Sequence, residues 1–157
     1  MTTATPTTPT TPTTPIVNGR VIALAHYAGR AVLERVLART GNTFNQSVTL
    51  RVVAIADTPI ERDKVAADVS GSLKIEESAV RTTIDELVAA KLVEEVPSDG
   101  SGLRLTPVGR ELFERVTAET GEISARIYAD IPAEDLATAG RVLTLVTERA
   151  NAELARM

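Results

Sequence analysis

The sequence feature that most constrains the fold is a cluster of turn-forming residues between two short apolar segments. Residues 97–102 read Pro-Ser-Asp-Gly-Ser-Gly, a composition that favours a turn and interrupts any helix. The segment before it, 92–96, and the segment after it, 103–105, are built mainly from Leu and Val. Two such segments on either side of a turn predict an antiparallel β-hairpin.

Helix start signals dominate the chain before this hairpin. Asn18 can cap a first helix that runs to about Thr40, where Gly41 would stop it. Thr43 and Gln46 have the spacing of a capping box and predict the start of a second helix.

Two further helices are predicted directly before the hairpin. Residues 58–61, Thr-Pro-Ile-Glu, place a hydroxyl cap before a Pro at the first helical position, so a short third helix is expected from there to about 70–71. The fourth helix is expected over about 76–91. Its apolar face is expected to consist of Val80, Ile84, Leu87 and Val88.

Two long helices are predicted after the hairpin. One starts at Thr106-Pro107 and runs to about Asp130, and a last one starts at Pro132. The expected fold is therefore mainly α: a winged helix-turn-helix, with a three-helix core and a two-stranded β-hairpin wing, between long N- and C-terminal helices. The outer helices have more apolar surface than so small a core can cover, which predicts that they form a homodimer interface.

Three segments resemble the multiple antibiotic resistance regulator (MarR) family. Residues 78–93 resemble its recognition helix and first wing strand, and residues 105–109, Leu-Thr-Pro-Val-Gly, are similar to the Leu-Thr-x-x-Gly that joins wing to dimerisation helix. Residues 131–136 resemble the start of its last helix. The sequence departs from the family in a short wing loop without Arg, and in a segment 70–75 that looks longer than the usual turn between helices.

The resemblance implies a homodimeric transcriptional regulator that binds double-stranded DNA at a near-palindromic operator. A cytoplasmic location is expected by default, because the sequence shows no secretory signal and no membrane span. The expected domains are a disordered Thr/Pro tail at 1–15 and an N-terminal dimerisation helix at 16–42. They are followed by the winged helix-turn-helix at 43–106 and the C-terminal dimerisation helices at 107–157. The tail is expected to be disordered because residues 2–15 hold three Thr-Thr-Pro units and no large apolar residue that could repay the entropy of ordering.

The predicted DNA-binding residues are Ser78, Arg81 and Thr82 on the outer face of the fourth helix, together with Lys74 and Arg104. Arginine bonding to guanine is the commonest base-specific contact in the major groove. The alternative is that Arg81 belongs to a solvated charge ladder, because Glu77 and Asp85 each lie four residues from it.

The charge distribution argues against tight DNA binding. Residues 57–106 hold six basic and eleven acidic residues, within a chain of net charge −4. Because non-specific affinity for DNA comes mainly from neutralised phosphates, this region is expected to hold DNA weakly unless its cations converge. A winged-helix dimer that binds a protein partner, and has lost DNA binding or binds it weakly, is therefore the alternative function.

A small aromatic ligand is the one further partner that the resemblance implies. The candidate ligand residues are His26, Tyr27 and Tyr128, although a lone His with two Tyr residues also suits packing or an interface. No enzyme motif, cofactor or metal site is expected, because the chain has no Cys, a single His, no Gly-rich phosphate loop and no nucleophile elbow. No apolar stretch is long enough to span a membrane, and no secretory signal is expected.

Overall fold

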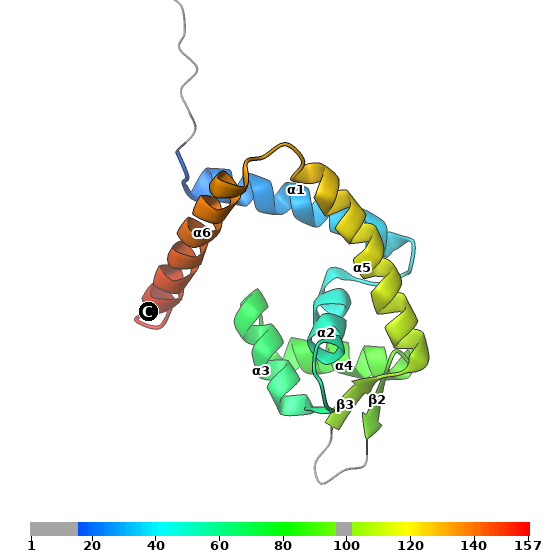
Figure 1. The fold of residues 1–157 in the computed structure, drawn as a ribbon. Coiled ribbons are helices and arrows are strands. Elements are labelled where there is room, and N and C mark those ends of the chain that lie inside the picture. Colours follow the sequence, from blue (N-terminus) through cyan, green and yellow to red (C-terminus); the bar gives the residue numbers. More distant parts are fainter. Residues whose placement is uncertain (1–15, 97–101) are drawn as a thin grey trace, which may run out of the picture. The chain divides into compact units, whose positions relative to one another are not determined.

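The computed structural model of the chain describes residues 16–96 and 102–157, so the predicted tail and most of the predicted turn lie outside it. The chain divides into two compact units, of which the second begins at Glu114, within one long helix. The elements are α1 (Gly19–Ala38), α2 (Phe44–Ala54), β1 (Ile60–Glu61), α3 (Arg62–Leu73), α4 (Glu77–Ala89), β2 (Val93–Val96), β3 (Gly102–Leu105), α5 (Pro107–Ile127) and α6 (Ala133–Leu154) (Figure 1). The predicted mainly helical winged-helix fold is confirmed.

Local capping explains where α1 and α2 begin. The Asn18 side chain accepts hydrogen bonds from the backbone N–H groups of Arg20 and Val21, at 3.0 and 3.1 Å. In the predicted capping box, Thr43 Oγ1 accepts from the Gln46 backbone at 3.2 Å and the Gln46 side chain accepts from the Thr43 backbone at 3.0 Å. Both caps satisfy N–H groups that the first helical turn leaves without partners.

The predicted start of the third helix is wrong. Residues 60 and 61 form β1, which pairs antiparallel with β3, so the sheet has three strands in the order β1-β3-β2 rather than the predicted two. The physical reason is that β3 would otherwise leave one edge of backbone N–H and C=O groups unpaired, and extended residues at Ile60 and Glu61 cover that edge.

α3 therefore starts later and ends later than predicted. It continues to Leu73 and closes on Lys74, which adopts the left-handed conformation at φ 57° and donates its backbone N–H to the Ser70 carbonyl at 2.8 Å. Within the segment 70–75, which looked too long for a turn, residues 70–73 form the last turn of this helix and Lys74 is its C-cap.

The core of the first unit lies between α2, α3, α4 and the sheet. α3 buries Val65, Ala66 and Val69, and α4 buries Val80, Ile84 and Leu87. The other buried apolar side chains are Val36, Leu37, Leu50, Val53, Leu92, Val93, Leu103, Leu105 and Leu112. Burying a Val, Leu or Ile side chain contributes about 1.5–3 kcal/mol, so this core fixes which face of α4 remains outside.

The start of α5 is fastened to the end of α4 at a joint formed by Lys91, Leu92, Thr106 and Gly109. The Thr106 hydroxyl donates to the Lys91 carbonyl at 2.6 Å and accepts from the Gly109 backbone at 3.0 Å, while the Thr106 N–H donates to the Leu92 carbonyl at 3.1 Å. A Cβ added at Gly109 would lie 1.9 Å from the Leu92 carbonyl oxygen, so only glycine fits there. The Leu-Thr-x-x-Gly sequence thus joins wing to helix through backbone contact.

The second unit contains the rest of α5 and all of α6. α5 ends at Ile127, three residues before the predicted Asp130, and Asp130 takes a positive φ of 63° in the connection to α6. α6 has no buried residue along its 22 positions, and its exposed apolar side chains include Val142, Leu143 and Val146. No helix in the described ranges is long and apolar enough to cross a membrane.

Candidate nucleic-acid interface

α4 presents one polar face because its opposite face is fixed in the core. Ser78 and Thr82 are exposed and Arg81 is partly exposed, one turn apart on the same side of the helix. The Thr82 hydroxyl donates to the Ser78 carbonyl at 3.1 Å, so its proton is used locally while its oxygen can still accept a bond. The three predicted DNA-binding residues of α4 therefore share one accessible face.

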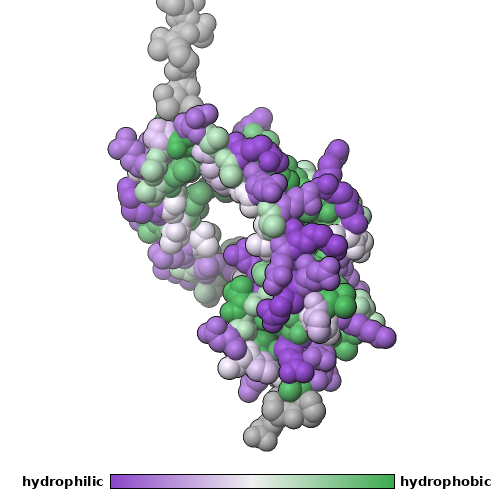
Figure 2. Space-filling model, turned by 45° about the vertical axis from the view of Figure 1, so that its right-hand side comes forward, coloured by the Kyte–Doolittle hydropathy of each residue, from purple (hydrophilic) through white to green (hydrophobic). Residues whose placement is uncertain are grey.

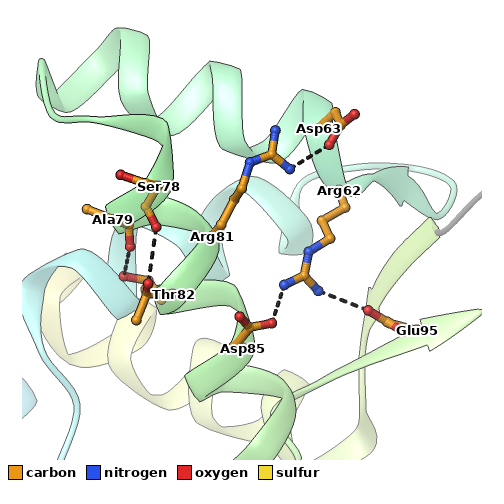
Figure 3. A network of polar contacts seen from close by, with 9 residues as sticks. Arg62, Asp63, Ser78, Ala79, Arg81, Thr82, Asp85 and Glu95 are labelled. Carbon is orange, nitrogen blue, oxygen red and sulfur yellow. Dashed lines mark hydrogen bonds and ion pairs between the residues drawn. The ribbon is translucent and has the colours of Figure 1, made fainter.

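Arg81 is held by two carboxylates. Its Nη1 donates to Asp63 of α3 at 2.7 Å (Figure 3), and its Nη2 lies 3.4 Å from Glu77 of α4. The hydrogen bond to Asp63 and the charge of Asp63 raise the pKa of Arg81, whose guanidinium carries a permanent positive charge as in any arginine. The sequence predicted the pair with Glu77 through its i,i+4 spacing, whereas the pair with Asp63 was missed.

Arg62, which no local sequence pattern indicated as a site residue, forms a second set of ion pairs beside Arg81. Its guanidinium contacts Asp85 of α4 and donates to Glu95 of β2 at 2.9 Å, and its side chain is only 20% exposed (Figure 3). The charge ladder predicted that Asp85 pairs with Arg81, but in the structure Asp85 pairs with Arg62. Arg62 ties the start of α3 to α4 and to the wing. Its partners lie 23 and 33 residues away, beyond the reach of any local pattern.

The two remaining candidates lie outside α4: Lys74 is in the turn between α3 and α4, and Arg104 is on β3 of the wing. Arg104, on β3, donates to Glu94 at 2.7 Å, and the two residues are direct cross-strand partners. Lys74, at the end of α3, is exposed, and no ion pair joins it to another described residue. Of the two, only Lys74 offers a charge that no carboxylate within the described ranges already balances.

The three ligand candidates are not among the residues that line a pocket described on the first unit. His26 and Tyr27 are in edge-to-face contact on α1, with ring centroids 5.7 Å apart, and Tyr27 is 64% exposed. Tyr128 belongs to the second unit and is also exposed. A pocket of about 480 Å³ lies elsewhere on the first unit, lined by Arg30, Glu34, Ala38, Asn42, Thr43, Phe44, Asn45, Thr83 and Glu86.

Most residues that line this pocket are polar, and the charged ones are already bonded to neighbouring side chains. Arg30 stacks over the Phe44 ring at 4.4 Å and pairs with Glu34 at 2.8 Å, and Glu86 accepts from Gln46 at 2.9 Å. Two carboxylates against one guanidinium make it unsuited to an aromatic acid. In the described part of the chain, no group of three or more His, Cys, Asp or Glu side chains is placed to hold a metal ion.

No protein-family model and no curated protein matches the sequence, but many solved structures share its fold. A transcriptional regulator, PA3341, matches with a TM-score of 0.72 at 21% identity, over 85% of this chain and 98% of that one. The MarR-family protein Rv2887 of Mycobacterium tuberculosis, in complex with p-aminosalicylic acid, has a TM-score of 0.64 at 22% identity, over 84% and 99%. CouR from Rhodococcus jostii RHA1, bound to p-coumaroyl-CoA, has a TM-score of 0.68 at 16% identity, over 82% and 89%. The chain thus has the winged-helix fold of MarR-family transcriptional regulators.

Proposed function

We propose that the protein is a homodimeric transcriptional regulator that binds a near-palindromic operator through paired α4 helices. The observation that carries this proposal is the exposed row of Ser78, Arg81 and Thr82 on α4 of a winged helix-turn-helix. These are side chains that can bond base edges or phosphates, on the element that enters the major groove in this kind of domain. Lys74 and Arg104 are the accompanying candidates for phosphate contacts.

The proposed dimer uses the outer helices, within the segments 16–42 and 107–157. α6 buries none of its residues, and Val142, Leu143, Leu145 and Val146 are each about 38–45% exposed. α1 exposes Val21, Leu24 and Val32 in the same way, and Figure 2 shows hydrophobic side chains at the surface among hydrophilic ones. Apolar helix faces of this extent need a partner, and a second copy supplies the same segments by symmetry.

A small aromatic ligand is proposed to modulate the regulator. Two proteins that share the fold are bound to p-aminosalicylic acid and to p-coumaroyl-CoA, both of which contain an aromatic ring. The candidate residues for such a ligand are still His26, Tyr27 and Tyr128. The proposed regulator is cytoplasmic and has no enzymatic activity. The acid-lined pocket next to Arg30 is not proposed for this role.

The second candidate function is binding of a protein partner by the same winged helix. It is favoured by one specific observation: Arg62, Arg81 and Arg104 are each already paired with carboxylates. DNA phosphates would have to compete with those carboxylates, whereas a basic protein surface would be attracted by the excess of acidic residues.

Selection of bound DNA from a random pool, with the full-length protein at low salt, separates the two functions. If the protein is a DNA-binding regulator, we expect an enriched, near-palindromic motif whose half-sites lie about 34–36 Å apart, which is one helical turn of DNA. A folded dimer that enriches no motif would refute DNA-specific regulation and favour the partner-binding alternative. Circular dichroism and light scattering on the same sample establish that the protein used was folded and dimeric.

A further inference from the structure

The guanidinium of Arg81 is oriented by a residue from the neighbouring helix of the helix-turn-helix. Asp63 lies in the first turn of α3, eighteen residues before Arg81, and the 2.7 Å bond joins α3 directly to the outer face of α4 (Figure 3). A long arginine side chain on an exposed surface samples many rotamers, and fixing it costs conformational entropy. A carboxylate that holds it before DNA arrives removes part of that cost from binding.

The bonds to Asp63 and Glu77 leave Arg81 able to recognise a base. A guanidinium has five N–H donors in a planar fork. Asp63 takes one donor on Nη1, and Glu77 lies at 3.4 Å from Nη2, so at most one donor of each nitrogen is engaged. The remaining donors are enough for the two-bond contact that arginine makes with O6 and N7 of guanine.

We propose that Asp63 is a positioning residue for base recognition, which orients Arg81 so that its free N–H donors meet guanine in each half-site. This inference rests on the proposed DNA-binding function. Asp63 weakens the attraction of the protein for DNA of any sequence, because it adds a negative charge. It strengthens discrimination at one base, because it fixes the orientation of the Arg81 guanidinium. These two effects have opposite signs and can be separated by experiment.

A simpler role for Asp63 is a negative charge at the start of α3, where it stabilises the helix dipole. Asp68 provides a matched control on the same helix, because it pairs with Lys64 at 2.9 Å and makes no contact with Arg81. Asp63→Ala and Asp68→Ala remove the same charge, but only Asp63→Ala removes a bond to Arg81. The Asp63 side chain is 82% exposed, so its removal leaves no cavity and the variant is expected to fold.

The test measures the affinity of each variant for the selected operator and for operators changed at the base where Arg81→Ala relaxes preference. Asp63→Ala is expected to reduce discrimination at that base about two- to fivefold, the range of an exposed ion pair, while affinity for random DNA is unchanged or rises. Asp68→Ala is expected to leave discrimination intact. In an Arg81→Ala background, Asp63→Ala should no longer change discrimination, because the residue through which it acts is absent.

Four results would overturn the inference. If Asp63→Ala changes affinity for all four bases equally, as Asp68→Ala does, Asp63 acts only as a charge. If it lowers discrimination equally with and without Arg81, it acts by another route. If the wild-type protein enriches no motif, both the proposed function and this inference are refuted. If the wild-type protein enriches a motif and Asp63→Ala leaves that motif unaltered, only the inference is refuted.

Discussion

Replacing Gly109 with Ala tests whether backbone contact at the joint holds the wing to α5. The added Cβ would lie 1.9 Å from the Leu92 carbonyl oxygen and 2.8 Å from its carbonyl carbon. Ordinary contact begins near 3.4 Å, so the two backbones must separate by more than an ångström. Neither can move alone, because Leu92 is buried and Gly109 lies in the first turns of α5.

The size of the effect follows from the contacts that this separation breaks. The hydrogen bonds from Thr106 to Lys91 and Leu92 would be lost, at about 1 kcal/mol each, and overpacking adds about 1–3 kcal/mol. The better helix propensity of Ala returns about 1 kcal/mol. We therefore expect Gly109→Ala to lower the free energy of unfolding by about 2–4 kcal/mol.

Urea denaturation followed by circular dichroism measures this loss, at one protein concentration because a dimer's stability depends on it. Gly121→Ala is the matched control: Gly121 lies in the same helix with no neighbouring atom within 4 Å of an added Cβ, so Ala should stabilise by up to about 1 kcal/mol. The reasoning is refuted if Gly109→Ala is as stable as Gly121→Ala.

The remaining predictions concern assembly, the tail and DNA reading. Deletion of 132–157 should give monomeric, aggregating or unfolded protein, and a well-folded full-length monomer at micromolar concentration in light scattering would contradict the dimer. Deletion of 2–15 should leave the melting temperature and DNA binding unchanged, and a clear loss of either would indicate a docking role. Arg81→Ala should relax preference at one base of each half-site about 5- to 150-fold. Arg104→Ala should weaken all sequences alike and lower the salt dependence, and Glu77→Gln should strengthen non-specific binding; titrations at several salt concentrations check both.

The parts of the fold that the sequence predicted correctly are those that depend on residues close together in the chain. Asn18, Thr43 and Gln46 make the caps that their spacing predicted, because a cap depends on atoms within three residues of one another. Residues 58–61 carried an equally good local signal that failed. There, pairing with β3 outweighed the helical preference, and the partner of Ile60 is Leu103, more than forty residues away.

The candidate site also has features that local spacing predicts and contacts that it does not predict. The exposed face of α4 follows from its apolar spacing, and the pair of Glu77 with Arg81 follows from helix geometry. The bonds that Asp63 and Arg62 make across α3, α4 and β2 depend on how these elements pack, which no spacing in the sequence specifies. For this reason the sequence identified Arg81 as a candidate but missed the residue that orients it.

The pairing of charges also changes what the acidic composition means for DNA binding. A net excess of acidic residues over 57–106 predicted weak binding by simple repulsion. In the structure, Arg62 and Arg81 are each balanced by two carboxylates, so each contributes little to the release of counterions from DNA. Non-specific affinity and its salt dependence should then both be low. A regulator built this way would gain its affinity for an operator from the geometry of base contacts, and correct placement of Arg81 would matter more than the number of cations around it.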